Sequence, residues 1–197
     1  MNKDGLTIGS SNYLSNTSFV NQNYAFRPYF KIAIEGGLGV YFAVGATSGK
    51  AGLFLAEAVY VDGVVTGVIV VKISLAALEN SWVQSGEKVW LSDELGIVFL
   101  SYDARWQYLG LRPLSLKDQK LVAETKQYGT EEIELFAIKD DNSKYSSVEL
   151  KGESEHILFQ QDIQGLGWKI SWLYSKAEFT KAINLKKIYL FSLYVFM

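Results

Sequence analysis

Runs of apolar residues divide the chain into two series of elements. Three runs rich in Val, Ile, Phe and Tyr predict strands in the first series: 39–46, 52–60 and 66–74. Asp62 and Gly63 lie between the last two runs and predict a tight hairpin. A short strand over 5–11 precedes this group, and a helix over 75–83 follows it. The first series therefore predicts one small antiparallel sheet with helices beside it.

A proline interrupts the helical pattern that precedes these strands. Residues 21–33 have helical character but contain Pro28. The residue before a proline is disfavoured in the α region, so we expect the backbone to bend at Arg27. Pro28 suits the first turn of a second short helix, which Gly36 and Gly37 would end.

A second series follows the same order of helix and strands. Its strand candidates are bounded by turn residues: 88–92, 96–102, 132–138, 145–150, 156–162 and 168–174. A helix is predicted over 115–128 with Ser115 as its N-terminal cap, and another begins after Ser175. The run 140–143 lacks the spacing of a calcium loop and predicts a hairpin turn.

The order of helix and antiparallel strands, taken twice, predicts an α+β protein with two small sheets. We expect a membrane-distal domain over 1–83 and a membrane-proximal domain over 84–175. Residues 176–197 would form a juxtamembrane helix and the start of a membrane span. Their last part, 188–197, is uncharged and apolar, and a complete span needs about 20 such residues. The alternative for this run is a buried core helix.

The composition excludes several classes of site. The chain has 197 residues, a formal net charge of -2 and no cysteine. The charge gives no support to a nucleic-acid partner. Without cysteine there are no disulfides, thiolate metal sites or cysteine nucleophile. His156 is the one histidine, and we expect it to be structural because a metal site would need further ligands. We predict neither a metal nor a cofactor.

Four polar residues in the first series predict a binding site for a small dianion. Arg27 lies beside Pro28 among aromatic residues, and Lys72 ends a β-branched run. Thr47 and Ser48 add two hydroxyl groups at the end of an apolar run. Arginine presents a planar pair of donors to one carboxylate, and lysine offers a point charge to the other. We interpret these residues as a binding site and not a reaction centre.

Plainer roles stay open for the same residues. Arg27 could pair with Glu35 or Glu57, and Lys72 could be an exposed lysine at a strand end. A hydrolase that uses Ser48 would need a partner base, and the one histidine is far away in sequence.

Four segments carry a family resemblance: Gly-Leu-Thr-Ile-Gly-Ser-Ser-Asn-Tyr (5–13), Tyr-Ala-Phe-Arg-Pro-Tyr-Phe (24–30), Tyr-Phe-Ala-Val-Gly-Ala-Thr-Ser (41–48) and Gly-Val-Ile-Val-Val-Lys (67–72). They resemble the extracytoplasmic sensor region of bacterial C4-dicarboxylate transport sensor histidine kinases of the DctB type. The turn at 93–98 also resembles the Asp-x-x-Gly turn of such tandem PAS-like, or double Cache, sensors.

The resemblance implies two PAS-like domains, of which the membrane-distal one binds succinate, fumarate or malate. Carried over by motif, Arg27 and Lys72 would hold the carboxylates. Thr47 and Ser48 would add hydrogen-bond donors, and Tyr24 would line the pocket.

The resemblance also implies a parent protein larger than this chain. That parent would be a homodimeric two-component kinase of the bacterial inner membrane, with its sensor region in the periplasm or extracytoplasmic space. The long first helix, the first membrane span and the kinase domain of the family are absent from the chain. The chain itself would be a binding module and not an enzyme. The alternative is the sensor domain of a chemoreceptor that binds another small carboxylate or an amino acid.

Overall fold

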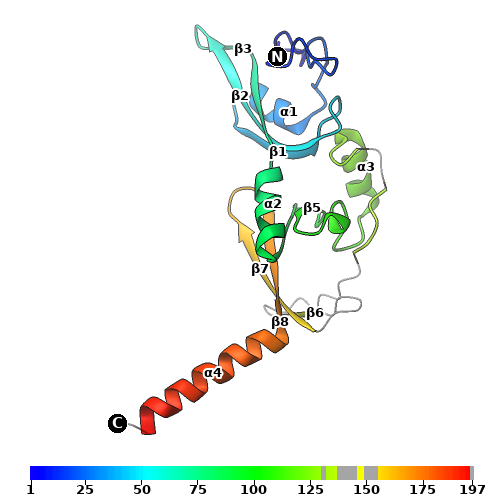
Figure 1. The fold of residues 1–197 in the computed structure, drawn as a ribbon. Coiled ribbons are helices and arrows are strands. Elements are labelled where there is room, and N and C mark those ends of the chain that lie inside the picture. The colour runs from blue at the N-terminus through cyan, green and yellow to red at the C-terminus, as the bar shows by residue number, and fades with distance from the viewer. Residues whose placement is uncertain (130–131, 137–145, 149–154, 196–197) are drawn as a thin grey trace. The chain divides into compact units, whose positions relative to one another are not determined.

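The computed structural model describes the chain except for residues 130–131, 137–145, 149–154 and 196–197 (Figure 1). The chain forms two compact units. The first unit contains Met1–Leu78 and Leu114–Ile133, and the second contains Glu79–Pro113 and Glu134–Met197. The first unit is therefore built from two stretches that are separate in sequence.

One short helix packs on a three-stranded antiparallel sheet in the first unit. The elements of this unit are α1 (Pro28–Ile34), β1 (Gly39–Val44), β2 (Ala51–Val61), β3 (Val64–Ile73) and α3 (Leu116–Thr125). The strand order is β1-β2-β3. Tyr29, Phe30 and Ala33 of α1 form a buried cluster with Phe54 and Val68 of the sheet. The predicted hairpin is confirmed, since Asp62 and Gly63 both have positive φ, at 50° and 75°.

The predicted bend before Pro28 is also confirmed. Arg27 is extended, with φ -74° and ψ 133°, and caps α1 from outside. The helix ends at Ile34, and Gly36 with φ 89° follows it. The predicted helical character before Arg27 is wrong, because the residues from 21 to 26 form turns and bridges. Asn21, with φ 65°, starts this segment in a left-handed conformation that a helix does not tolerate.

The predicted strand over 5–11 is wrong. Gly5 has φ 79°, and the chain there makes only isolated bridges, such as Leu6 to Asn23. Thr7 instead donates its amide to Gln22 O at 2.9 Å. The segment is extended and hydrogen-bonded, but it pairs with a loop and joins no sheet.

The second unit contains one five-stranded antiparallel sheet. Its elements are α2 (Ala76–Ser85), which contains the division between the units, β4 (Lys88–Ser92), β5 (Val98–Ser101), the 3₁₀ helix η1 (Ala104–Trp106), β6 (Ser146–Val148), β7 (His156–Ile163), β8 (Trp168–Ser175) and α4 (Lys176–Val195). The strand order is β5-β4-β8-β7-β6. Trp90 and Trp106 meet edge to face with ring centroids 5.5 Å apart and anchor its core. The expected α+β class with two antiparallel sheets is thus confirmed.

Several smaller predictions fall in the second unit. His156 is buried, and its Nε2 lies 3.1 Å from Lys88 Nζ, as a structural histidine would. The predicted strand over 132–138 is wrong for its described part, 132–136, because only Leu135 makes a bridge there. The predicted turn at 140–143 lies outside the described residues. Within the part of the chain that the structure covers, no three or more His, Asp or Glu side chains are grouped as metal ligands would be.

The last helix, α4, carries the apolar run that we expected to enter a membrane. It spans Lys176–Val195. Among the described residues, no helix combines the length and the apolar character that crossing a bilayer requires. The predicted membrane span stays a prediction.

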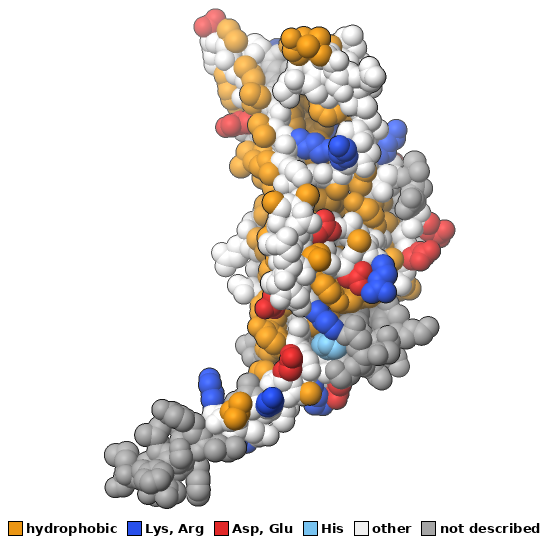
Figure 2. Space-filling view, in the orientation of Figure 1, with side chains coloured by type: hydrophobic (Ala, Val, Ile, Leu, Met, Phe, Trp, Pro, Cys, Tyr) orange, Lys and Arg blue, Asp and Glu red, His pale blue; other side chains and the backbone are white. Residues whose placement is uncertain are grey.

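Hydrophobic side chains also reach the surface of the first unit along the hairpin of β2 and β3 (Figure 2). The exposed members are Val59, Tyr60, Val61, Val64, Ile69, Val71 and Ile73. In the same unit, Figure 2 shows blue basic side chains gathered close to one another near β1.

Candidate ligand-binding site

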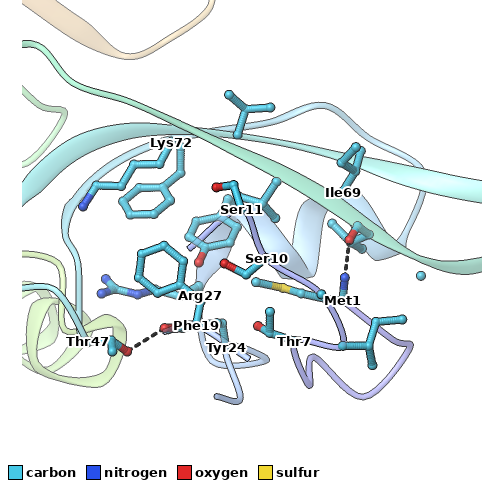
Figure 3. Close-up of a pocket in the computed structure, with 18 of the residues that line it drawn as sticks. Met1, Thr7, Ser10, Ser11, Phe19, Tyr24, Arg27, Thr47, Ile69 and Lys72 are labelled. Carbon is cyan, nitrogen blue, oxygen red and sulfur yellow. Dashed lines mark hydrogen bonds between the residues drawn. The ribbon is translucent and has the colours of Figure 1, made fainter. Parts of the chain in front are cut away.

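A cavity of about 940 Å³ lies within the first unit (Figure 3). Its walls come from β3, from the loop between β1 and β2, from the turn before α1 and from the N-terminal segment. All five residues that the sequence analysis assigned to ligand binding line it: Tyr24, Arg27, Thr47, Ser48 and Lys72. The structure therefore brings together residues that are up to 48 positions apart in the chain, although their role in binding stays a prediction.

Arg27 is a buried cation at one end of the cavity, with only 1% of its surface exposed. Its Nη1 donates to Thr125 O at 3.0 Å and to Lys126 O at 3.1 Å, and its Nη2 donates to Val44 O at 2.7 Å. Burial lowers the pKa of Arg27 below the usual arginine value. Arg27 therefore donates to backbone carbonyls and not to Glu35 or Glu57, which were the alternative partners.

Lys72 is a half-buried cation from β3 at the same end. Its Nζ donates to Ser48 Oγ at 3.1 Å and to Lys50 O at 2.6 Å. The ammonium lies 5.2 Å from the centre of the Phe54 ring. Desolvation is the main cause that lowers the pKa of Lys72, and the charges of Arg27 and Lys50 add to it. Lys72 is therefore not the freely exposed strand-end lysine of the plainer reading.

Two glycines leave the space that the Lys72 side chain occupies. A Cβ at Gly52 would lie 2.7 Å from Lys72 Cε, and a Cβ at Gly45 would lie 2.9 Å from Lys72 Nζ. A Cβ at Gly45 would also lie 2.5 Å from Ser48 Oγ. The loop and the neighbouring strand are thus shaped around the ammonium group.

The hydroxyl groups of Tyr24 and Thr47 meet at 2.6 Å on the floor of the cavity. Aromatic rings complete the wall. Tyr29 stacks on Phe54 with ring centroids 5.0 Å apart and planes 7° from parallel. Burial raises the pKa of Tyr29, so its hydroxyl stays protonated and neutral. The cavity therefore combines two cations with neutral hydroxyls and an apolar wall.

Comparisons with known proteins agree with the resemblance seen in the sequence. No family model matches the chain. The C4-dicarboxylate transport sensor protein DctB of Pseudomonas aeruginosa is 40% identical over 116 residues, which cover 59% of this chain and 19% of that protein. DctB of Rhizobium meliloti is 32% identical over 129 residues, which cover 66% of this chain and 21% of that protein.

A solved structure covers more of the chain. The sensor domain of the V. cholerae histidine kinase DctB superposes with a TM-score of 0.81 at 29% identity. The match covers 89% of this chain and 70% of that domain. The chain is similar to DctB-type sensor regions over most of its length.

The matched residues span about a fifth of the length of the curated relatives. What it matches among solved structures is a sensor domain and not a catalytic module. The prediction that this chain is a binding module, with tandem PAS-like architecture, is confirmed by that match.

One contact in the cavity has a distance like that between a catalytic nucleophile and its general base. Ser48 Oγ and Lys72 Nζ lie 3.1 Å apart. However, Lys72 donates to Lys50 O as well as to Ser48. A short hydrogen bond to a carbonyl is stronger from a charged ammonium than from a neutral amine, whereas a general base must be neutral. The geometry therefore favours charge presentation to a ligand over hydrolysis.

One polar residue of the cavity, Thr7, was not predicted from the sequence. Thr7 is buried, with 5% of its surface exposed, and it lines the cavity. Among the described residues, none forms a hydrogen bond with its Oγ1. Thr7 lies in one of the segments that carry the family resemblance. However, the sequence of a predicted strand does not show that a threonine hydroxyl is buried without a hydrogen-bond partner.

Proposed function

We propose that this chain binds C4-dicarboxylates such as succinate, fumarate and malate, and that it does so in the cavity of the first unit. The observation that carries the proposal is that two cations, Arg27 and Lys72, lie at one end of a single cavity. The hydroxyl groups of Tyr24, Thr47 and Ser48 line the same cavity. Two cations with separate donor geometries suit a ligand with two carboxylates. The name of the relatives, C4-dicarboxylate transport sensor protein, supports the same ligand class.

Burial adds to the preference for a dianion. Desolvation lowers the pKa of both Arg27 and Lys72 in the free cavity. Two like charges that are partly removed from water attract an anion more strongly than exposed charges do. The two cations also repel each other. A bound dicarboxylate would offset this repulsion, and a neutral ligand would not.

We propose the following parent protein and signalling route. The parent is a homodimeric histidine kinase of the inner membrane, and this sensor region lies in the periplasm. Ligand binding favours a closed form of the first unit and shifts the population of states. The change would pass through the second unit to the helix α4 (Lys176–Val195) and the membrane.

A chemoreceptor sensor that binds an amino acid is the second candidate. An amino acid would call for a carboxylate that faces its ammonium group. Arg27 and Lys72 are the charged side chains among the residues that line the cavity, and both are cations. This charge pattern favours the dicarboxylate.

Calorimetric titration of the chain with succinate tests the proposal. We expect saturable binding that Lys72→Met lowers by about tenfold or more, because a partner of a charged hydrogen bond is lost. Lys31→Met, on the exposed face of α1 and outside the cavity lining, is the matched control and should keep the affinity. Arg27→Ala is less clean, because it also removes the donors to three carbonyls and should lower stability.

The controls separate binding from the other functions. Alanine and serine as ligands should give no heat at the same concentrations. Binding of amino acids but not of succinate would overturn the dicarboxylate proposal in favour of the second candidate. Turnover of a p-nitrophenyl ester that Ser48→Ala abolishes would overturn it in favour of a hydrolase.

A further inference from the structure

Thr7 carries a buried hydroxyl that the fold does not use. Its backbone is held firmly, because its amide donates to Gln22 O at 2.9 Å and its carbonyl accepts from Asn21 N at 2.9 Å. Only 5% of the surface of Thr7 is exposed, and the residue lines the cavity. No described residue is a hydrogen-bond partner of Oγ1. A buried hydroxyl without a partner is unfavourable in the ligand-free state, so a ligand that supplies one gains a favourable contact.

The position of Thr7 restricts what that ligand group is. Figure 3 shows Thr7 on the side of Tyr24 away from Thr47, whereas the Arg27 and Lys72 side chains reach toward the Thr47 side. In this view the two charged side chains that line the cavity therefore lie on the other side of Tyr24 from Thr7.

Figure 3 shows two polar groups near Thr7, and each already makes a hydrogen bond. The Ser10 hydroxyl is hydrogen-bonded to Asn12 Oδ1. The amino group of Met1 donates to Val68 O at 2.7 Å. No acidic side chain is among the described residues that line the cavity, so an oxygen-bearing ligand group such as a hydroxyl can approach Thr7 without charge repulsion.

We propose that Thr7 is a specificity-determining residue, and that its hydroxyl bonds the hydroxyl of a 2-hydroxy dicarboxylate such as malate. This inference rests on the proposed function, because it takes the two carboxylates to be held by Arg27 and Lys72. With both carboxylates at the cationic end, the group that extends toward Thr7 is a substituent of the carbon chain. The cavity of about 940 Å³ lies in the upper part of the range for small-molecule pockets and leaves room for it.

Calorimetry of the whole chain with succinate and with each enantiomer of malate tests this role. Thr7→Val removes the hydroxyl and keeps the branched shape, and Thr7→Ser keeps the hydroxyl. We expect Thr7→Val to lower the affinity for the preferred malate enantiomer by about tenfold and to leave succinate within about twofold. Thr7→Ser should retain the preference for malate.

Thermal unfolding of the ligand-free variants separates ligand contact from a structural role. Because the hydroxyl has no partner in the ligand-free cavity, Thr7→Val should unfold at the same or a higher temperature than the unchanged chain. A lowered unfolding temperature would assign Thr7 a structural role and overturn the inference. Equal losses for succinate and malate, or no loss for either, would also overturn it while leaving the dicarboxylate site in place. Failure of the unchanged chain to bind either acid would overturn the proposed function itself.

Discussion

At the scale of single residues, Arg27 serves the fold and the cavity at once. A guanidinium group has five N–H donors, and three hydrogen bonds tie it to the carbonyls of Thr125, Lys126 and Val44. The remaining N–H groups are available to one carboxylate. The fold therefore fixes the direction of the guanidinium before the ligand arrives, which lowers the ordering cost of binding.

Lys72 gives a prediction about pH. Its pKa in the free cavity lies below the ordinary lysine value of 10.5, mainly through desolvation. A bound dianion favours the charged form and raises this pKa. Binding then takes up a proton wherever Lys72 is partly neutral in the free cavity. We expect the affinity for succinate to be constant well below the lowered pKa and to fall as the pH rises through it.

Calorimetry in buffers with different ionisation enthalpies measures the proton uptake directly. The uptake should be smallest well below the lowered pKa and should increase as the pH rises toward it. Lys72→Arg is the control, because arginine stays protonated throughout this range. Any binding that it retains should show no such uptake. A flat pH profile for the unchanged chain would assign the ligand charge to Arg27 alone.

Site residues could be predicted from the sequence only where a local sequence pattern restricts the backbone or the position of the residue. The proline fixes the backbone before it, so Pro28 marked Arg27, and a lysine at the end of a β-branched run marked Lys72. Two of the three carbonyl partners of Arg27 lie 98 and 99 positions away in the chain, and no local pattern points to them. Thr7 was missed because its distinguishing property is burial without a partner, which only the three-dimensional structure shows.

At the scale of elements, the loop from Gly45 to Lys50 shapes the anion end of the cavity. Gly45 N donates to Lys50 O at 2.9 Å, and Gly49 N donates to Gly45 O at 2.8 Å. The same Lys50 carbonyl accepts from Lys72 Nζ. The loop therefore closes on itself and holds the lysine of β3 in one place.

Adding one methyl group at Gly45 tests this arrangement. In Gly45→Ala, the new Cβ would lie 2.5 Å from Ser48 Oγ and 2.9 Å from Lys72 Nζ, so both groups must move. We expect the succinate affinity to fall by about tenfold, which is the cost of losing one hydrogen bond to a charged group. Gly9→Ala also adds a methyl group at the cavity wall, but its Cβ meets nothing within 4 Å and should change little.

The unfolding temperature decides how the Gly45 result is read. The atoms nearest the new Cβ are the mobile ends of two side chains, so the stability of the fold should change little. Weak binding with a normal unfolding temperature supports a shaped anion end. Normal binding by Gly45→Ala would show that the positions of Ser48 and Lys72 do not matter to the ligand.

Strands were predicted well where apolar runs were continuous and bounded by turn residues. The expected strand over 88–92 has the bounds of β4, and the expected hairpin runs have close to the bounds of β2 and β3. The segments at 5–11 and 132–136 look similar in sequence, yet they make only isolated bridges. Apolar content indicates an extended segment, but it does not say whether a partner strand exists, since pairing depends on distant parts of the chain.

At the scale of the whole molecule, the two compact units do not follow one another along the chain. Residues 114–133 return to the first unit after the chain has entered the second. They bring Thr125 and Lys126 to Arg27, and Gln127 O to Val44 N at 2.7 Å. The cationic end of the cavity therefore depends on a segment that a simple division of the sequence would place elsewhere, and the sequence offered no pattern from which to predict it.

This arrangement predicts where a ligand slows amide hydrogen exchange. A ligand that binds only the closed form protects every amide whose opening breaks the site. At a concentration about 100 times the Kd, exchange through such openings should slow by about 100-fold. Since Arg27 and Val44 are bonded to the returning segment, succinate should protect residues 122–128 as well as 24–72. Lys72→Met should lose both effects at the same succinate concentration. Protection confined to 24–72 would mean that the returning segment supports the fold but takes no part in the response to the ligand.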